Sequence, residues 1–266
     1  MRRYQKGGYL VFAVVLWVGA CTPVIEPKPA GEAEPVKRSW SADELMQNLA
    51  RRGEQFRSLR ALAAVSYQGP DGKGSFEEAV LVERPARLRL ETLSALGALL
   101  VITADGKEVA GLYPREGLFF RGESTKNNLR LYTRIPLELS EITAVLMGLP
   151  PGVGEAGWEF QDGMAQRALA GGGKEIVMFD SALGIPSQWQ RLEAGGTIEI
   201  GGSFADFSTA SSHPFPLRIS LQASADNMRV DLRYRDPELN VELPSGVFAQ
   251  QKPAYAKEVP MESLPQ

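Results

Sequence analysis

The sequence predicts a mainly β protein with helices, in which consecutive strands form an antiparallel sheet. Through most of the chain, short segments alternate apolar and polar residues, which is the period of a strand with one buried face. Gly, Pro, Asp and Asn mark the turns between these segments. Two segments, residues 41–59 and 135–151, instead space their apolar residues as a helix does. Short strands joined by tight turns favour a meander over an α/β sheet.

The chain begins with the features of a secretory signal over residues 1–20. Three basic residues, Arg2, Arg3 and Lys6, precede an apolar run at 9–18 that is too short to span a membrane. Residues 18–21, Val-Gly-Ala-Cys, resemble the lipobox of bacterial lipoproteins, which implies cleavage before Cys21 and acylation of that residue. Thr22, in place of an aspartate, favours the outer membrane by the same resemblance.

Cys21 is the only cysteine in the chain, so no disulfide framework within the chain is available to it. Acylation would account for this thiol, whereas an uncleaved anchor or an incidental buried cysteine are the alternatives. After Cys21, the segment to residue 40 contains four prolines and charges of both signs. Such a segment is typical of an extended tether, with a reach of roughly 60 Å at the rise of a polyproline chain. A spacer without further function fits it equally well.

Composition limits the function classes. The chain has a net charge of −3, and removal of the basic signal would make it more acidic, so neither a nucleic-acid surface nor a polybasic membrane patch is expected. A hydrophobic content of 44% is sufficient for a sizeable core. We expect one large β-rich domain over residues 41–249, with two smaller domains as the alternative.

The first predicted helix, residues 41–59, begins with the spacing of a capping box, Ser41 and Glu44. Its apolar stripe consists of Leu45, Leu49, Phe56 and Leu59. Strands are then predicted at 62–68 and 75–83, with a turn at residues 69–72 between them.

A hairpin is predicted for residues 87–105, and its tip is unusual. Residues 93–98, Leu-Ser-Ala-Leu-Gly-Ala, contain none of the Asn, Asp or Lys residues that usually make a turn soluble. Leu93 and Leu96 could therefore contact an apolar surface outside the protein. They could equally fold back beneath the loop and cap the core.

Further strands are predicted at 108–113 and 118–120, before the second helical segment at 135–151. Pro136 can occupy the first turn of this helix, and Gly148 with the prolines that follow would end it. The helix could plug one end of the sheet or cover a cavity. Strands resume at 158–161, 166–170, 175–180, 187–193, 197–207, 217–223 and 228–235, and residues 250–266 are expected to form a flexible tail.

Catalysis is not expected. The single histidine, His213, lies in a loop-like segment, and one imidazole supports neither a zinc site nor an evident Ser/His/Asp assembly. The glycines at 171–173 and 201–202 do not match a phosphate-binding loop and are more typical of turns or bulges. No metal, cofactor or catalytic residue is therefore assigned.

Two short motifs resemble the LolB family of outer-membrane lipoprotein receptors. The hairpin tip matches at residues 95–97, Ala-Leu-Gly, and the second helical segment matches at 135–137, Ile-Pro-Leu, and 148–150, Gly-Leu-Pro. The lipobox, the tether and the amphipathic first helix are part of the same resemblance. The chain lacks the family's proline at the tip, and it has glycine-rich later turns and a longer C-terminal end.

The resemblance implies a single curved antiparallel sheet that forms an unclosed β-barrel, covered by helices over an apolar cavity. It implies that Leu96, with Leu93, inserts in the membrane. The cavity and its lid would be formed by Leu139, Ile142, Val145, Leu146, Leu88, Leu90 and Val101.

The function implied by the resemblance is that of an outer-membrane lipoprotein facing the periplasm. A monomer, held in the membrane by the acyl chains on Cys21, would receive acylated lipoproteins from a periplasmic LolA-like carrier and insert them. A carrier of other lipids, and a scaffolding lipoprotein that binds a protein partner through the same fold, remain the alternatives.

Overall fold

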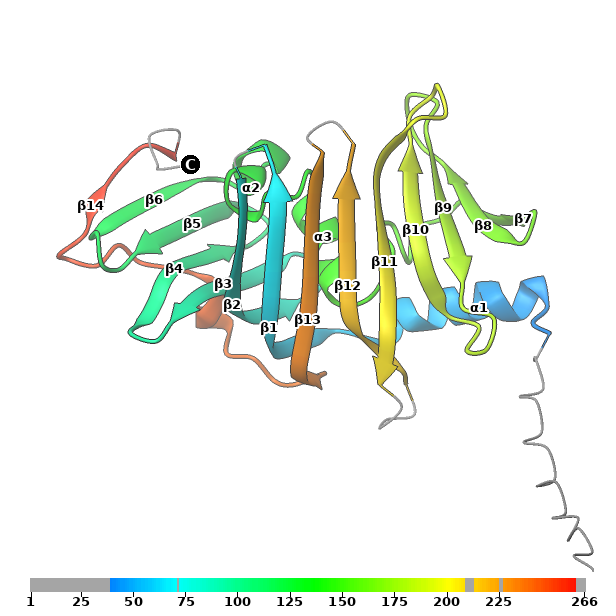
Figure 1. Cartoon of the computed structure of the whole chain (residues 1–266), viewed down its shortest axis with the longest axis horizontal. Coiled ribbons are helices and arrows are strands. Elements are labelled where there is room, and N and C mark those ends of the chain that lie inside the picture. The colour runs from blue at the N-terminus through cyan, green and yellow to red at the C-terminus, as the bar shows by residue number, and fades with distance from the viewer. Residues whose placement is uncertain (1–38, 71, 209–212, 225–226, 262–266) are drawn as a thin grey trace, which may run out of the picture. The chain divides into compact units, whose positions relative to one another are not determined.

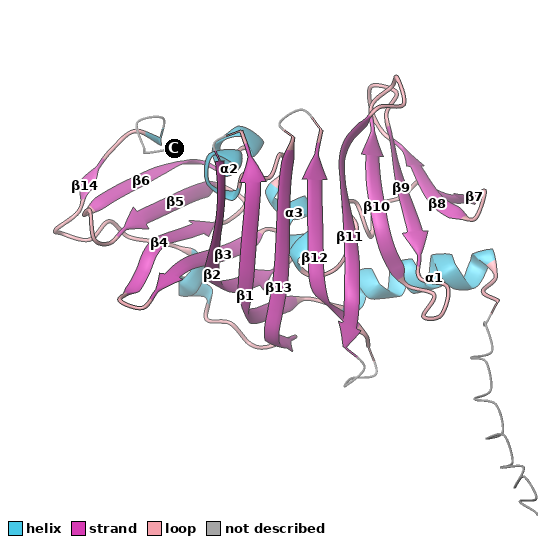
Figure 2. Ribbon diagram, viewed as in Figure 1, coloured by secondary structure: helices cyan, strands magenta, loops and turns pink. Residues whose placement is uncertain are grey.

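The computed structural model describes residues 39–70, 72–208, 213–224 and 227–261. The predicted signal, Cys21 and nearly all of the tether lie outside these residues. The described chain forms fourteen strands, three α-helices and one short 3₁₀ helix (Figures 1 and 2). The helices are α1 (Ala42–Gln55), α2 (Lys126–Thr133), α3 (Leu139–Leu146) and η1 (Ser245–Phe248).

All fourteen strands belong to one curved, unclosed sheet, as predicted. The strands of the N-terminal half are β1 (Ser58–Gly69), β2 (Gly72–Glu83), β3 (Arg87–Ser94), β4 (Gly97–Ala104), β5 (Glu108–Tyr113) and β6 (Leu118–Glu123). Those of the C-terminal half are β7 (Trp158–Gln161), β8 (Met164–Ala168), β9 (Lys174–Phe179), β10 (Pro186–Leu192), β11 (Ile198–Ser208), β12 (Phe215–Ala223), β13 (Met228–Leu239) and β14 (Lys257–Glu258).

The strand order shows how the two runs of antiparallel strands, β1 to β6 and β7 to β13, join in one sheet. The order is β14-β6-β5-β4-β3-β2-β1-β13-β12-β11-β10-β9-β8-β7, so the two halves meet where β1 pairs with β13. Every neighbouring pair is antiparallel except β14 with β6, which is parallel. The predicted meander is therefore confirmed, with strand ends that differ from the expected ones by a few residues.

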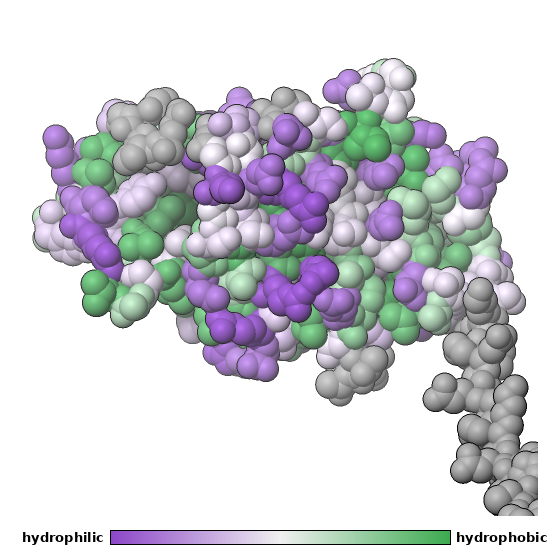
Figure 3. All heavy atoms as spheres, viewed as in Figure 1, coloured by the Kyte–Doolittle hydropathy of each residue, from purple (hydrophilic) through white to green (hydrophobic). Residues whose placement is uncertain are grey.

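The central strands have an apolar inner face and a polar outer face. On β13, Val230, Leu232 and Tyr234 are buried on the inner side, whereas the three arginines that alternate with this set, Arg229, Arg233 and Arg235, are exposed. Figure 3, which looks onto the outer face, shows hydrophilic side chains across these central strands. The alternation arises because successive side chains of a strand point to opposite sides of the sheet.

Helix α1 begins as the sequence predicted and ends earlier. Ser41 is the N-cap, and its side chain and that of Glu44 form the expected capping box. The backbone becomes extended at Phe56, so Leu59 lies in β1 and not in the helix. Arg52 Nη1 donates to Pro214 O over 2.9 Å, which attaches the last helical turn to the segment before β12.

Helix α3 is shorter than the predicted helix at 135–151. Glu138 is its N-cap, so Pro136 precedes the helix and does not occupy its first turn. The four predicted apolar positions of this helix are all buried. Two hydrogen bonds attach it to the sheet. Thr143 Oγ1 donates to Pro85 O, in the turn between β2 and β3, at 2.6 Å, and Tyr234 OH on β13 donates to Leu146 O at 2.8 Å.

The predicted flexible tail is wrong for residues 250–261, which are ordered against the sheet. Lys257 N donates to Gly117 O at 2.7 Å, and β14 extends the sheet beside β6. Ala256 and Met261 are buried. Gln250 Nε2 donates to Val101 O at 3.1 Å and Thr103 Oγ1 at 3.3 Å, so this segment covers the outer face of β4.

Candidate functional site

The inner face of the sheet and the helices enclose a cavity of about 320 Å³, here called the inner cavity. Strands β1 to β4 and β13 form one wall, and α2, α3 and the residues between them form the other. Most of its lining is apolar or aromatic: Val65, Tyr67, Phe76, Leu90, Leu100, Ile102, Tyr132, Ile135, Ile142, Leu146, Val230 and Leu232. The polar residues among the rest of the lining are Lys73, Glu78, Thr92, Thr133 and Arg134.

Three of the seven residues predicted to form the cavity or its lid line it: Leu90, Ile142 and Leu146. Leu88, Leu139 and Val145 are instead fully packed core residues that do not border the cavity. The cavity is therefore lined mainly by residues other than the seven that the sequence suggested.

Val101 is on the other face of the sheet, so its prediction as a cavity residue is wrong. Leu90 lies opposite Ile102 in the β3–β4 ladder, and opposite residues share a face. The Thr103 side chain contacts Gln250 of the C-terminal segment, and Val101, two residues earlier, shares that outer face. Val101 is buried because the C-terminal segment covers it.

The β3–β4 hairpin connects the inner cavity to the most exposed large apolar side chain in the described residues. Leu96 has 85% of its surface exposed, and Leu93 is half-buried beside it. The two-residue turn is closed by Ser94, whose Oγ donates to Gly97 O at 2.8 Å and accepts from Leu96 N at 3.2 Å. Gly97 has φ +106°, a conformation that favours glycine.

The tip lies beyond the cavity along the same two strands. Thr92 and Leu100 face each other and both line the inner cavity, whereas β3 ends at Ser94 and Leu96 lies in the turn that follows. At the rise of a strand, the end of β3 is roughly 7 Å beyond Thr92, and the turn continues past it. Leu96 does not fold back beneath the loop, and it faces solvent.

Glu78 is the polar residue of the cavity that the sequence analysis did not identify. It lies on β2 directly opposite Thr92, whose Oγ1 is 3.4 Å from Glu78 Oε1. Burial raises the pKa of the Glu78 carboxyl to about 7, and the contact with Thr92 opposes this shift. The alternation of Phe76, Glu78, Val80 and Val82 contained the signal, because it places this carboxylate on an apolar face.

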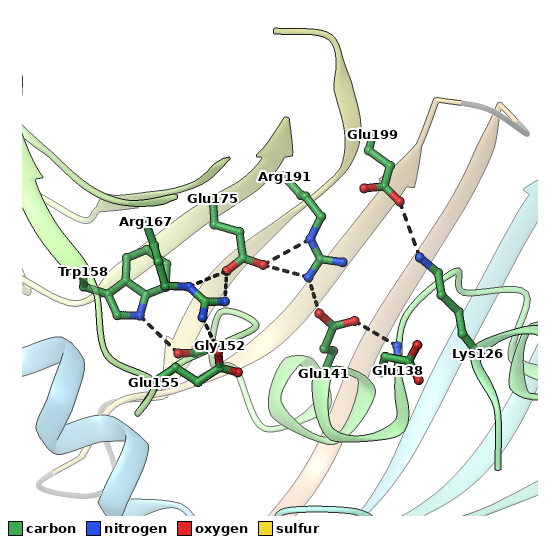
Figure 4. A network of polar contacts seen from close by, with 10 residues as sticks. All are labelled: Lys126, Glu138, Glu141, Gly152, Glu155, Trp158, Arg167, Glu175, Arg191 and Glu199. Atoms are coloured by element: carbon green, nitrogen blue, oxygen red, sulfur yellow. Dashed lines mark hydrogen bonds and ion pairs between the residues drawn. The ribbon is translucent and has the colours of Figure 1, made fainter. Parts of the chain in front are cut away.

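A buried ionic network fixes α3, the helix over the cavity, against the C-terminal half of the sheet (Figure 4). Glu175 on β9 is 2% exposed, and its two oxygens accept from Arg167 Nη2 at 2.5 Å and Arg191 Nη2 at 2.7 Å. Arg191 also pairs with Glu141 in the first turn of α3. Arg167 also pairs with Glu155 and lies over the Trp158 ring.

Among residues 39–261, apart from the undescribed gaps, no group of three or more His, Cys, Asp or Glu side chains is arranged to hold a metal ion. His213 is exposed and does not border the inner cavity. Within the same residues, no helix is long and apolar enough to cross a membrane.

Comparison with known proteins identifies the fold. No protein-family model and no curated protein matches the chain. A proposed outer-membrane lipoprotein-sorting domain from Vibrio parahaemolyticus is similar over 77% of this chain and 94% of its own, with a TM-score of 0.52 and 11% identity. A DUF1329 family protein from Desulfovibrio piger is similar over 82% of this chain and 98% of its own, with a TM-score of 0.55 and 10% identity.

Both similarities extend over nearly the whole of the solved chains, and their identities are low. They therefore establish the fold and leave the function to the site. The fold is mainly β, with one curved, unclosed antiparallel sheet and helices that cover its inner face.

Proposed function

We propose that this protein is a lipid-anchored envelope protein that receives acylated lipoproteins and inserts them in the outer membrane, the receptor role of the LolB family. The supporting observation is the β3–β4 hairpin, because one element both lines an apolar cavity and ends in an exposed leucine. A site that must accept an acyl chain and release it into a bilayer needs both features close together.

The inner cavity is suited to an acyl chain. Its volume of about 320 Å³ falls within the range of small-molecule sites, and its walls are mainly aliphatic and aromatic. Transfer of a chain from water to such walls gains about 0.8 kcal/mol per buried methylene group. The bilayer offers a similar gain, so a cavity that holds the chain slightly less well than the membrane does would release it without ATP.

The hairpin tip is suited to brief contact with a membrane. Burial of one leucine side chain contributes about 1.5–3 kcal/mol, which is enough to orient the cavity against a bilayer and too little to hold a protein there. Stable attachment would come from the acyl chains on Cys21. Residues 22–40 would then allow the domain to reach a periplasmic carrier and return to the membrane.

The proposed partners are acylated lipoproteins, a LolA-like carrier in the periplasm and the outer membrane, and the domain is proposed to act as a monomer without catalysing a reaction. The relation to a lipoprotein-sorting domain from Vibrio parahaemolyticus supports the lipoprotein as cargo at the level of fold. Carriage of another acylated lipid would use the same cavity.

A transfer assay tests this proposal. A fluorescent lipoprotein is supplied as a complex with its soluble carrier to vesicles that do or do not contain this protein, and vesicle-bound fluorescence is measured over time. We expect transfer only with the protein present and only for the acylated cargo; the same cargo without acyl chains is the control. If transfer is equal without the protein, the receptor role is wrong, and the scaffolding role becomes the better explanation.

A further inference from the structure

Glu78 places a carboxylate where an acyl chain would lie. It is on the inner face of β2 between Phe76 and Val80, and the cavity that it borders is otherwise mostly apolar. Burying a carboxylate beside apolar walls is costly unless a partner compensates for the lost hydration. A cavity that served only to hold hydrocarbon would be better lined by leucine at this position.

The carboxylate has little compensation within the protein. Its hydrogen bond from Thr92 Oγ1 is long, at 3.4 Å, and only one of the two carboxylate oxygens accepts it. In the described part of the chain, no arginine or lysine forms an ion pair with Glu78. The side chain is thus available to accept a hydrogen bond from a ligand in the cavity.

The other titratable or charged groups that border the cavity are two tyrosines, one lysine and one arginine: Tyr67, Tyr132, Lys73 and Arg134. Tyr234 is close enough that the Glu78 charge contributes to the raised pKa of its phenol, although burial is the larger cause. Among the described residues, neither Lys73 nor Arg134 forms an ion pair with Glu78. The carboxylate oxygens of Glu78 therefore remain acceptors inside the cavity.

An acyl chain can be linked through an amide, linked through an ester, or end in a free carboxylate, and these three groups would interact differently with Glu78. An amide N–H can donate to the carboxylate, and it satisfies an acceptor that the chain would otherwise desolvate. An ester has no donor, so it leaves the carboxylate unsatisfied. The carboxylate of a free fatty acid would be repelled by an ionised Glu78.

We propose that Glu78 selects the ligand of the inner cavity, by accepting a hydrogen bond from the N–H of an amide-linked acyl chain in preference to an ester-linked chain or a free fatty acid. This inference rests on the proposed function, because it specifies the chemistry of the cargo that the cavity takes. It assigns to Glu78 a role in specificity, whereas the apolar walls supply most of the affinity.

The test uses two ligands that differ in one linkage. The N,N-dimethylamide of N-decanoylglycine carries one N–H, in the amide next to its chain, and the decanoyl ester of N,N-dimethylglycolamide has an oxygen in its place and no N–H donor. Each ligand competes with an apolar fluorescent reporter for the full chain carrying Cys21→Ser, purified without detergent. Glu78→Leu removes the acceptor, and Glu78→Gln retains an uncharged acceptor of the same size. Glu77→Gln, on the opposite face of the same strand, is the matched control.

At pH 8 we expect the amide to bind roughly 10-fold more tightly than the ester, from one hydrogen bond to a charged acceptor. Glu78→Leu should abolish this preference, and Glu77→Gln should leave it unchanged. Because a bound ester desolvates the ionised carboxylate, its affinity should fall as the pH rises through about 7, and Glu78→Gln should remove that dependence.

Equal affinities of the two ligands for the Cys21→Ser protein, or a preference that survives Glu78→Leu, would overturn the role of Glu78. In either case the reporter and both ligands still bind, and the proposed function stands. Failure of the reporter and of both ligands to bind would instead overturn the proposed function, and this inference with it.

Discussion

Arg191 on β10 forms an ion pair with Glu141 in the first turn of α3, and this pair joins the C-terminal half of the sheet to the helix above the inner cavity. The same guanidinium donates to Glu175 and pairs with its charge, although Glu175 is nearly inaccessible to solvent. Together these two carboxylates raise the pKa of the Arg191 guanidinium against the opposing effect of burial. The cavity roof is therefore attached by electrostatic contacts in addition to apolar packing.

Arg191→Leu should destabilise the protein strongly, because it leaves Glu175 with one partner and Glu141 with none from the sheet. We expect a loss of about 3 kcal/mol in the free energy of unfolding, at the low end for a broken buried pair, since Arg167 remains on Glu175. Arg60→Leu is the control, because its pair with Glu238 is exposed and screened by solvent, so its loss should change the stability much less. Urea denaturation of both variants measures the loss in the free energy of unfolding. An equal loss in the two variants would contradict this role of the network.

The raised pKa of Glu78 predicts that stability changes with pH. The folded carboxyl has a pKa of about 7, above its ordinary value of 4.5, so the folded state holds a proton that the unfolded state has already released. Stability from this group is fully present below pH 4.5 and is lost as the pH rises to about 7, by up to about 3 kcal/mol.

Thermal melting between pH 4.5 and 8 measures this dependence. Glu78→Gln should flatten the curve over that range, because the amide does not titrate. Carboxyls with lowered pKa values, such as Asp105 and Asp231, affect stability below this range and should do so equally in both proteins. A curve of the same slope in Glu78→Gln would show that another group is responsible.

The meander could be predicted from the sequence because most strands alternate apolar and polar residues and most turns contain Gly, Pro, Asp or Asn. Helix α2 could not, because Asn127 and Asn128 are weak helix formers and only Leu129 is buried. Thr125 caps it through the backbone N–H of Asn128, without the Glu or Gln that would have completed a capping box. Contacts with the rest of the protein, such as the stacking of Tyr132 on Phe120, compensate for the weak propensity.

The cavity residues were harder to predict than the fold, for a physical reason. Strand β4 is apolar on both faces, since the inner cavity covers Ile102 and the C-terminal segment covers Val101. Alternation of apolar and polar residues identifies the buried face of a strand only when the other face is exposed to solvent. The ordered C-terminal segment itself depends on contacts such as that from Gln250 to Val101, between residues 149 positions apart, which no local pattern reveals.

Leu96→Glu should separate cargo binding from cargo delivery. The side chain is exposed, so the substitution should change the free energy of unfolding by less than about 0.5 kcal/mol and leave cargo affinity intact. Delivery into vesicles should fail, because a carboxylate does not enter the apolar part of a bilayer. Leu62→Glu, at another exposed leucine on the outer face of β1, is the matched control and should deliver normally. Normal delivery by Leu96→Glu would exclude membrane insertion of this residue.

Cys21→Ser should release the protein from the membrane while the domain stays folded. Acyl chains and not the domain surface are proposed to anchor the protein, and one exposed leucine is too weak to replace them. Fractionation of cells that express the variant, together with a melting curve of the purified protein, measures both properties. A variant found entirely with outer membranes would show that another part of the chain supplies the anchor.

The central claim is that the inner cavity holds the acyl chain, and its most direct test is the affinity for an N-acylated lipoprotein peptide before and after Leu90→Gln. Leu90 lines the cavity and is half-buried, so the change places an amide against the chain and leaves the packed core in place. Leu62→Gln makes the same change on the outer face. We expect Leu90→Gln to weaken binding by about 10-fold or more, because a polar group is buried without a partner, and Leu62→Gln to have no effect. Unchanged affinity in a folded Leu90→Gln protein, or an equal loss in both variants, would contradict this claim.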